Sequence, residues 1–153
     1  MAEHETTIDI DAPPDIVWEH LVTADGLSAW MGERVEVEPT AGGRFAMHIQ
    51  GSEIRGQFVE VDAPRRLVIT WGVLGSADHP PGSSAVEFRL AKLDRGTQVT
   101  LKHTGLPVRS TPMHAAGWAY FLPRLAAVAS GAQPEETDWS KVVAPTRMQG
   151  EPQ

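Results

Sequence analysis

The sequence predicts an α+β fold, in which a curved, mainly antiparallel sheet of seven strands wraps around one long C-terminal helix. Between residues 6 and 104, segments with alternating apolar and polar side chains recur, as in half-buried strands. Residues 111–131 instead repeat apolar side chains every three or four positions, which gives a helix one apolar stripe. Two short helical segments separate the first strand from the second.

The first strand is expected at residues 6–10, which alternate as TTIDI. The run DAPPD then ends the strand and begins a helix, because proline is tolerated in a first turn and an acidic residue there complements the helix dipole. Thr23 is placed to cap a second short helix that Gly32 ends. These two helices precede the remaining strands.

Six closely linked strands follow, and their spacing implies antiparallel pairing. A change of phase near Val59 predicts a bulge in the third of these six strands. The Gly-, Pro- and Ser-rich residues 72–84 predict a mobile loop. The strands are expected at residues 34–38, 43–50, 52–61, 65–71, 85–92 and 97–104.

The long helix has recognisable ends. Thr111 is expected to cap it, Pro112 suits its first position, and Gly131 is placed to stop it. Pro123 removes one backbone hydrogen bond inside the helix and should kink its axis near Ala119. The apolar stripe of this helix needs a large surface, which the predicted sheet supplies.

Composition limits the classes of function. The 153 residues suit one domain, expected at residues 1–131, followed by a polar tail, residues 132–153, whose apolar residues are Trp139, Val142 and Val143. A net charge of −7 disfavours nucleic acid and anionic membrane surfaces as partners. The chain has no cysteine and shows no signal-peptide pattern, so we expect a cytoplasmic protein.

Several motifs together resemble the START-like (SRPBCC) superfamily, and most closely its bacterial branch named after the activator of the heat shock protein 90 ATPase. They are IDAPPDIVWEHL, LSAWM, GGRF, the segment from GQF to VITW, VTLKHTGLP, and HAAGWAYFLPRL. The resemblance covers residues 8–130. It implies the helix-grip fold, with a mostly apolar cavity between sheet and helix, and a family whose members include lipid and polyketide binders, cyclases and chaperone-associated proteins.

His103 is the polar residue of greatest interest. It follows Val99 and Leu101 in strict alternation, so it should face the interior near the end of its strand, where His114 can approach it. An imidazole there suits a ligand contact or proton transfer, but a structural hydrogen bond is the alternative that we favour. We find no metal motif, no catalytic nucleophile paired with a base, and no indication of a cofactor.

Aromatic and methionine side chains are the candidate walls of an apolar pocket, although core packing explains any single one of them as well. Arg109 precedes the long helix, where a surface ion pair is favoured over contact with an anionic ligand. The candidate ligand-binding residues are Trp30, Met31, Phe45, Met47, Trp71, Phe88, His103, His114, Trp118, Phe121 and Leu122.

These observations favour a binding protein over an enzyme. The leading hypothesis is a domain that encloses a hydrophobic small molecule between the sheet and the C-terminal helix. One alternative is a cyclase or aromatase that uses the same cavity, with His103 moving protons. Another is a module that binds a protein partner, such as a chaperone, or a second copy of the chain.

Overall fold

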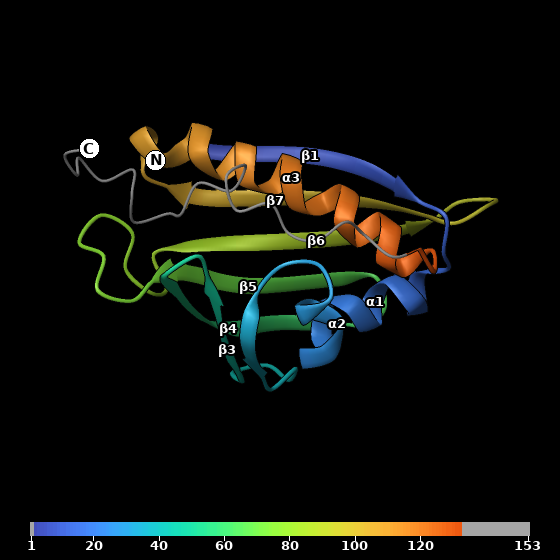
Figure 1. Cartoon of the computed structure of the whole chain (residues 1–153), viewed down its shortest axis with the longest axis horizontal. Coiled ribbons are helices and arrows are strands. Elements are labelled where there is room, and N and C mark those ends of the chain that lie inside the picture. Colours follow the sequence, from blue (N-terminus) through green and yellow to red (C-terminus); the bar gives the residue numbers. More distant parts are fainter. Residues whose placement is uncertain (1, 133–153) are drawn as a thin grey trace.

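The computed structural model describes residues 2–132, which form one curved sheet with a long helix lying across its inner face (Figure 1). The seven strands are β1 (Ala2–Ile10), β2 (Glu33–Val37), β3 (Arg44–Ile49), β4 (Ser52–Asp62), β5 (Arg66–Val73), β6 (Ser84–Lys92) and β7 (Thr97–Leu106). Of the predicted tail, residues 133–153 lie outside the described residues, together with Trp139, Val142 and Val143.

The strands lie in the order β1-β7-β6-β5-β4-β3-β2, and every neighbouring pair is antiparallel. From β2 to β7 each strand therefore pairs with the next in sequence, whereas β1 pairs with β7. A register shift between Phe58 and Glu60 confirms the predicted bulge in β4. The sheet class and its strand number agree with the prediction.

The two short helices between the first strands are confirmed as α1 (Pro14–Val22) and α2 (Ala24–Ser28). Thr23 caps α2 as expected, because its hydroxyl oxygen accepts a hydrogen bond from the Gly26 N–H at 2.9 Å. The apolar face of α1 is buried at Val17, Trp18 and Leu21. Within residues 2–132, the helices fall short of the length and apolarity that crossing a membrane requires.

The long helix, α3 (Thr111–Ala129), follows a single turn of 3-10 helix, η1 (Val108–Ser110). The expected cap at Thr111 is wrong by one residue: Thr111 already has helical dihedral angles, so Ser110 is the N-cap. The helix α3 ends just before Gly131, as predicted. Gly131 has a φ of 90°, and the N–H of Ala132 beyond it donates to Ala127 O at 2.8 Å.

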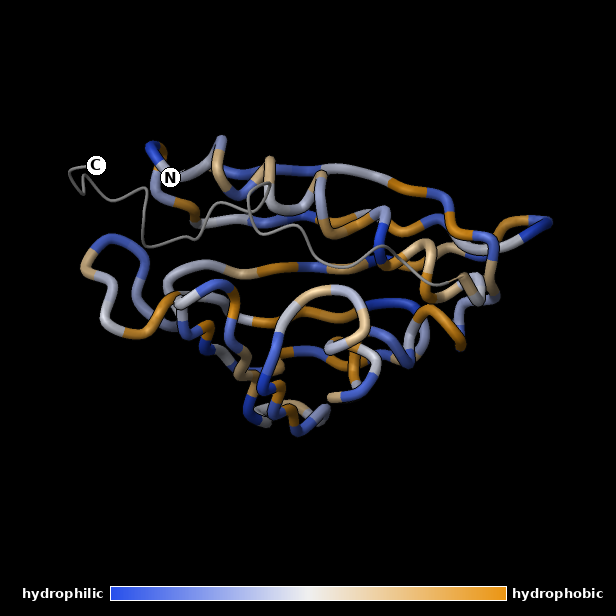
Figure 2. Tube along the Cα trace, in the orientation of Figure 1, coloured by the Kyte–Doolittle hydropathy of each residue, from blue (hydrophilic) through white to orange (hydrophobic). Residues whose placement is uncertain are grey.

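Pro123 lies inside α3, as the sequence requires. Pro123 and Ala119 are both exposed, so the carbonyl that loses its helical partner faces away from the core. The apolar stripe of α3 faces the sheet and buries Trp118, Phe121 and Leu125. Along the strands that α3 covers, apolar and polar residues alternate, as Figure 2 shows.

The first strand is longer than predicted, because it begins at Ala2 and not at Thr6. The added residues pair with the end of β7, where Ala2 lies opposite Leu106 and His4 opposite His103. Their polar composition gave no sign of a strand, but pairing with β7 supplies partners for their backbone groups. The register places His4 beside the strand position of His103.

The loop predicted at residues 72–84 is shorter in the structure, because Gly72 and Val73 still belong to β5 and Ser84 begins β6. Residues 74–83 form the loop, which packs onto the end of the sheet. Its His79 is 1% exposed, and the carbonyl of His79 accepts the Val73 N–H at 2.8 Å. Gly72 lies directly beneath the loop: a Cβ at this position would stand 2.1 Å from Pro80 O. The close approach of the two backbones therefore depends on the missing side chain.

Candidate functional site

A buried polar cluster lies between the sheet and the first turns of α3. It contains three histidines, His79 from the loop, His103 from β7 and His114 from α3, with exposed fractions of 1%, 0% and 7%. The His114 ring centroid lies 5.1 Å from that of His79 and 5.1 Å from that of His103. The predicted approach of His114 to His103 is confirmed. We call His79, Ser84, His103, His114 and Trp118 the histidine cluster.

Ser84, the first residue of β6, joins two of these histidines. Its Oγ lies 2.9 Å from Trp71 O, 2.7 Å from the Nε2 of His79 and 2.9 Å from the Nε2 of His103. A carbonyl only accepts, so the single hydroxyl proton of Ser84 goes to Trp71 O. Both Nε2 atoms must then donate their protons to Ser84 Oγ.

The indole of Trp118 fixes the protonation of His103 independently. Its Nε1–H donates to the Nδ1 of His103 at 3.2 Å, so that nitrogen carries a lone pair and the ring proton is on Nε2. Both nitrogens of His103 are therefore paired. This agrees with the structural role that the sequence favoured for His103.

The other two histidines each keep one unpaired nitrogen. Since His79 donates from Nε2, its Nδ1 carries a lone pair; since His114 bonds Ser110 O at 2.9 Å, it donates from Nδ1, and its Nε2 carries the lone pair. Neither His79 Nδ1 nor His114 Nε2 has a hydrogen-bond partner among the described residues. Two buried acceptors thus lie on rings that are in contact.

Electrostatics keeps all three imidazoles neutral. Burial, and then the nearby His114, lower the pKa of His79 to about 4. Burial also lowers the pKa of His103 well below its usual value, with smaller effects from His114, His79 and His4. For His114, burial outweighs the opposing hydrogen bond to Ser110 and lowers the pKa. The assignment of one proton to each ring is therefore the one expected near neutral pH.

Aromatic rings surround the cluster on the sheet side. Trp71 lies 5.5 Å from Trp118 and 5.9 Å from His103 between ring centroids, and Phe45 and Phe88 extend the same group. The indole Nε1–H of Trp71 is buried and has no partner in the described part of the chain. Six of the predicted ligand-binding residues come together here: Phe45, Trp71, Phe88, His103, His114 and Trp118.

The remaining candidates are buried, but no ring contact or hydrogen bond joins them to the histidine cluster. Trp30 serves the packing of the helices, because its Nε1–H donates to His20 O at 2.8 Å and its carbonyl accepts from Arg124 at 3.2 Å. The five residues of this group are Trp30, Met31, Met47, Phe121 and Leu122, each at most 5% exposed. Whether any of them contacts a ligand stays a prediction.

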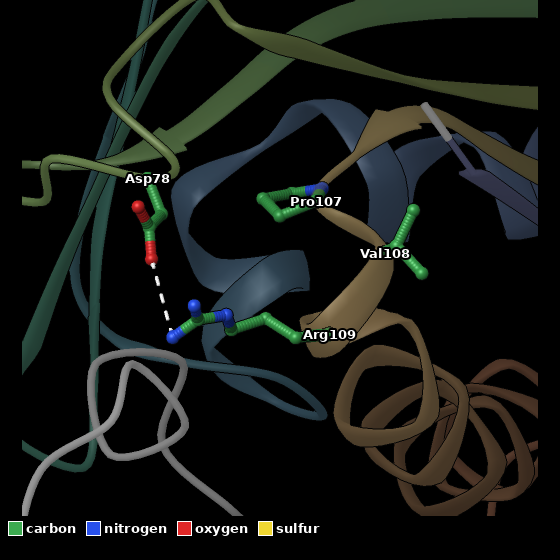
Figure 3. Close-up of a pocket in the computed structure, with 4 residues that line it drawn as sticks. All are labelled: Asp78, Pro107, Val108 and Arg109. Atoms are coloured by element: carbon green, nitrogen blue, oxygen red, sulfur yellow. Dashed lines mark ion pairs between the residues drawn. The ribbon is translucent and has the colours of Figure 1, made fainter.

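A surface pocket of about 420 Å³ lies between the loop and η1, lined by Asp78, Pro107, Val108 and Arg109 (Figure 3). Asp78 precedes the buried His79 in the loop, and the other three residues lead into α3 just before His114. Arg109 and Asp78 point toward one another across the pocket and form an ion pair at 4.0 Å. The ion pair that the sequence favoured for Arg109 is thus present.

The chemistry of Ser84 differs from that of a hydrolase. A serine nucleophile needs a base that accepts its proton, whereas both neighbouring imidazoles donate to Ser84 and its own proton points to a backbone carbonyl. Among residues 2–132, no group of three or more potential metal ligands is suitably arranged. The two unpaired nitrogens of the cluster are hydrogen-bond acceptors.

Sequence reasoning missed His79 and Ser84. His79 stands in a loop without period, next to two prolines, so no pattern indicated that it is buried. Ser84 was detectable, because it continues the inward alternation of Val86, Phe88 and Leu90 by one step toward the loop. An inward serine at a strand end indicates a polar partner.

The curved sheet, the long helix across it and the two inserted helices define a START-like helix-grip domain. Residues 11–130 match the family described as Activator of Hsp90 ATPase homolog 1-like protein, and the chain belongs to this family. No curated protein matches the chain significantly.

Solved structures agree with this assignment. An AHSA1-like protein from Rhizobium etli is 33% identical, with a TM-score of 0.68, over 88% of this chain and 86% of that one. CalU16 from Micromonospora echinospora is 28% identical, with a TM-score of 0.72, over 87% and 76%. The Aha1 dimer from Colwellia psychrerythraea, 18% identical over 88% and 100% with a TM-score of 0.76, shares the fold.

Proposed function

We propose that this protein binds a small, largely apolar molecule at the end of the interface between α3 and the sheet. The ligand enters through the pocket of Asp78, Pro107, Val108 and Arg109 and reaches the histidine cluster behind it. The observation that carries the proposal is a pocket of about 420 Å³ beside buried polar atoms that lack partners. Such a combination of apolar walls and a few polar groups is typical of ligand sites.

The energetics of the cluster support binding. Leaving a buried polar atom without a hydrogen bond costs about 1–3 kcal/mol, so the two unpaired nitrogens of the cluster and the Nε1–H of the neighbouring Trp71 are poorly satisfied by the protein alone. A bound molecule that pairs them recovers part of this free energy. The surrounding rings of Trp71, Trp118 and Phe88 offer apolar contact to the rest of that molecule.

The walls of the pocket are held together weakly. The side chains of Arg109 and Asp78 are 62% and 44% exposed, and exposed ion pairs stabilise a protein by about 0–1 kcal/mol. Breaking this ion pair therefore costs little. A ligand is able to displace this contact when it enters.

The enzyme alternative, a cyclase with His103 as proton carrier, has less support. Both nitrogens of His103 are paired, and its lowered pKa disfavours proton uptake near neutral pH. The protein-binding alternative predicts a partner that still binds when the pocket is filled.

Native mass spectrometry of freshly purified protein tests the proposal directly. We expect a mass above that of the chain, and this extra mass should disappear when the protein is denatured. NMR titration with 2-naphthol should shift the indole Nε1–H signals of Trp71 and Trp118. A second surface pocket of about 350 Å³ on the outer face of the sheet, lined by Glu5, Glu87, Arg89, Thr100 and Lys102, is an internal control. Shifts confined to that charged pocket, or no binding, would refute the proposal.

A further inference from the structure

The two unpaired imidazole nitrogens specify the polar end of the ligand. We infer that the ligand is uncharged at this end and carries a hydroxyl group, a phenol or an alcohol, which donates to His79 Nδ1 or His114 Nε2. This inference rests on the proposed function, which it deepens by naming a ligand class. The observation is the protonation pattern that the hydrogen bonds impose on the cluster.

The argument begins with Ser84. Three polar atoms surround its hydroxyl at 2.7–2.9 Å, and each contact needs one proton between its two atoms. The carbonyl of Trp71 has no proton to give, so it takes the one of Ser84. With neutral rings, this leaves a single arrangement in which every contact is a hydrogen bond, and in it the lone pair of His79 is on Nδ1.

His114 also has one nitrogen with an unpaired lone pair, but a different hydrogen bond determines it. Its Nδ1 must donate to the carbonyl of Ser110 one turn earlier, which places the lone pair on Nε2. His114 is 7% exposed and His79 is 1% exposed, so bulk water does not solvate these nitrogens freely. Both nitrogens are therefore buried acceptors, and only a group that supplies a donor can pair them.

A hydroxyl group fits better than a carboxylate, a ketone, an ether or an ammonium group. A carboxylate brings only acceptors at neutral pH and would meet two lone pairs, and a ketone or an ether has no donor. An ammonium group has donors, but its charge would be desolvated beside three neutral imidazoles. A hydroxyl oxygen also accepts, which suits the unpaired Nε1–H of Trp71 in the same group of rings.

Three probes with one ring system separate these possibilities: 2-naphthol donates, 2-methoxynaphthalene accepts without donating, and 2-naphthoate is an anion. Calorimetric titration at pH 7 should show 2-naphthol binding about tenfold more tightly than 2-methoxynaphthalene, with 2-naphthoate weakest. The ¹⁵N shifts of His79 Nδ1 and His114 Nε2 should respond to 2-naphthol and not to 2-methoxynaphthalene. This readout uses the unaltered protein and needs no variant to fold.

Variants show which imidazole nitrogen accepts the hydrogen bond from the ligand. The substitutions His79→Phe and His114→Phe each remove an unpaired acceptor and should reduce the preference for 2-naphthol over 2-methoxynaphthalene to about twofold or less. His20→Phe is the matched control, because the Nδ1 of His20 also bonds a carbonyl one turn earlier, Ile16 O at 2.9 Å, and His20 lies on α1. The control should keep the wild-type preference.

The outcomes separate the two proposals. If both neutral probes bind with equal affinity and the ¹⁵N shifts of the imidazoles do not change, a water molecule already pairs the two nitrogens. The proposed function then stands, and the inference of a hydroxyl group is overturned. If 2-naphthoate binds most tightly, the inference is likewise wrong. If none of the probes binds, the ligand site itself fails and the inference fails with it.

Discussion

Mild acid should weaken the fold measurably, and His79 accounts for much of the effect. Its pKa is lowered to about 4 in the folded chain, against 6.5 for an ordinary histidine. Between these values the unfolded chain binds a proton that the folded chain does not, so this contribution to stability is complete above pH 6.5 and is lost as the pH falls. The pKa values of His103 and His114 are lowered too, and act in the same direction.

The size of the effect follows from the two pKa values of His79. At about 1.36 kcal/mol per pH unit, the difference between them limits the loss to about 3 kcal/mol, and about 2 kcal/mol of this applies between pH 7 and pH 5. The part of the loss that comes from His79 is the part that a substitution at this position removes.

Urea unfolding followed by circular dichroism at pH 7, 6 and 5 measures this change as a free energy of unfolding. The variant His79→Phe should be less stable at pH 7 but should lose about 2 kcal/mol less than the wild type on going to pH 5. His20→Phe is again the control. An equal loss in wild type and His79→Phe would show that the neutral buried state assigned to His79 is wrong.

Two further substitutions test the packing around the cluster. Trp118→Phe removes the N–H that pairs His103 Nδ1 and should lower the free energy of unfolding in urea by about 1–3 kcal/mol, unless another donor replaces the indole. Gly72→Ala places a Cβ against Pro80 O and should displace the loop, which hydrogen exchange of the Val73 N–H would report as faster exchange. Unchanged exchange in Gly72→Ala would argue against close packing of the loop.

The spacing of apolar residues predicts most elements of the fold. In the strand predicted at residues 65–71, alternation gives Leu67, Ile69 and Trp71 one shared face. The structure buries all three, because a strand with one face on a core tolerates no other phase. The same reasoning oriented His103 correctly. Long-range pairing was less visible, since the early part of β1 owes its strand conformation to β7 and not to its own sequence.

The candidate site was predictable only in part. His103 and Trp118 lie on regular elements, so their period revealed which way they face. His79 lies in a loop, and its burial depends on how residues 74–83 pack over Gly72, which no local pattern encodes. The protonation of the cluster depends on all of these residues together, so it could be derived only from their distances.

The pairing of β1 with β7 also shapes how this chain folds. Thr6 pairs with Leu101, and Ile8 with Val99, so these contacts join distant parts of the described chain. During synthesis, the first strand leaves the ribosome long before β7 exists, and such distant contacts slow folding. Closing the sheet with β1 and β7, the two strands farthest apart in the sequence, thus adds distant contacts of the kind that slow folding.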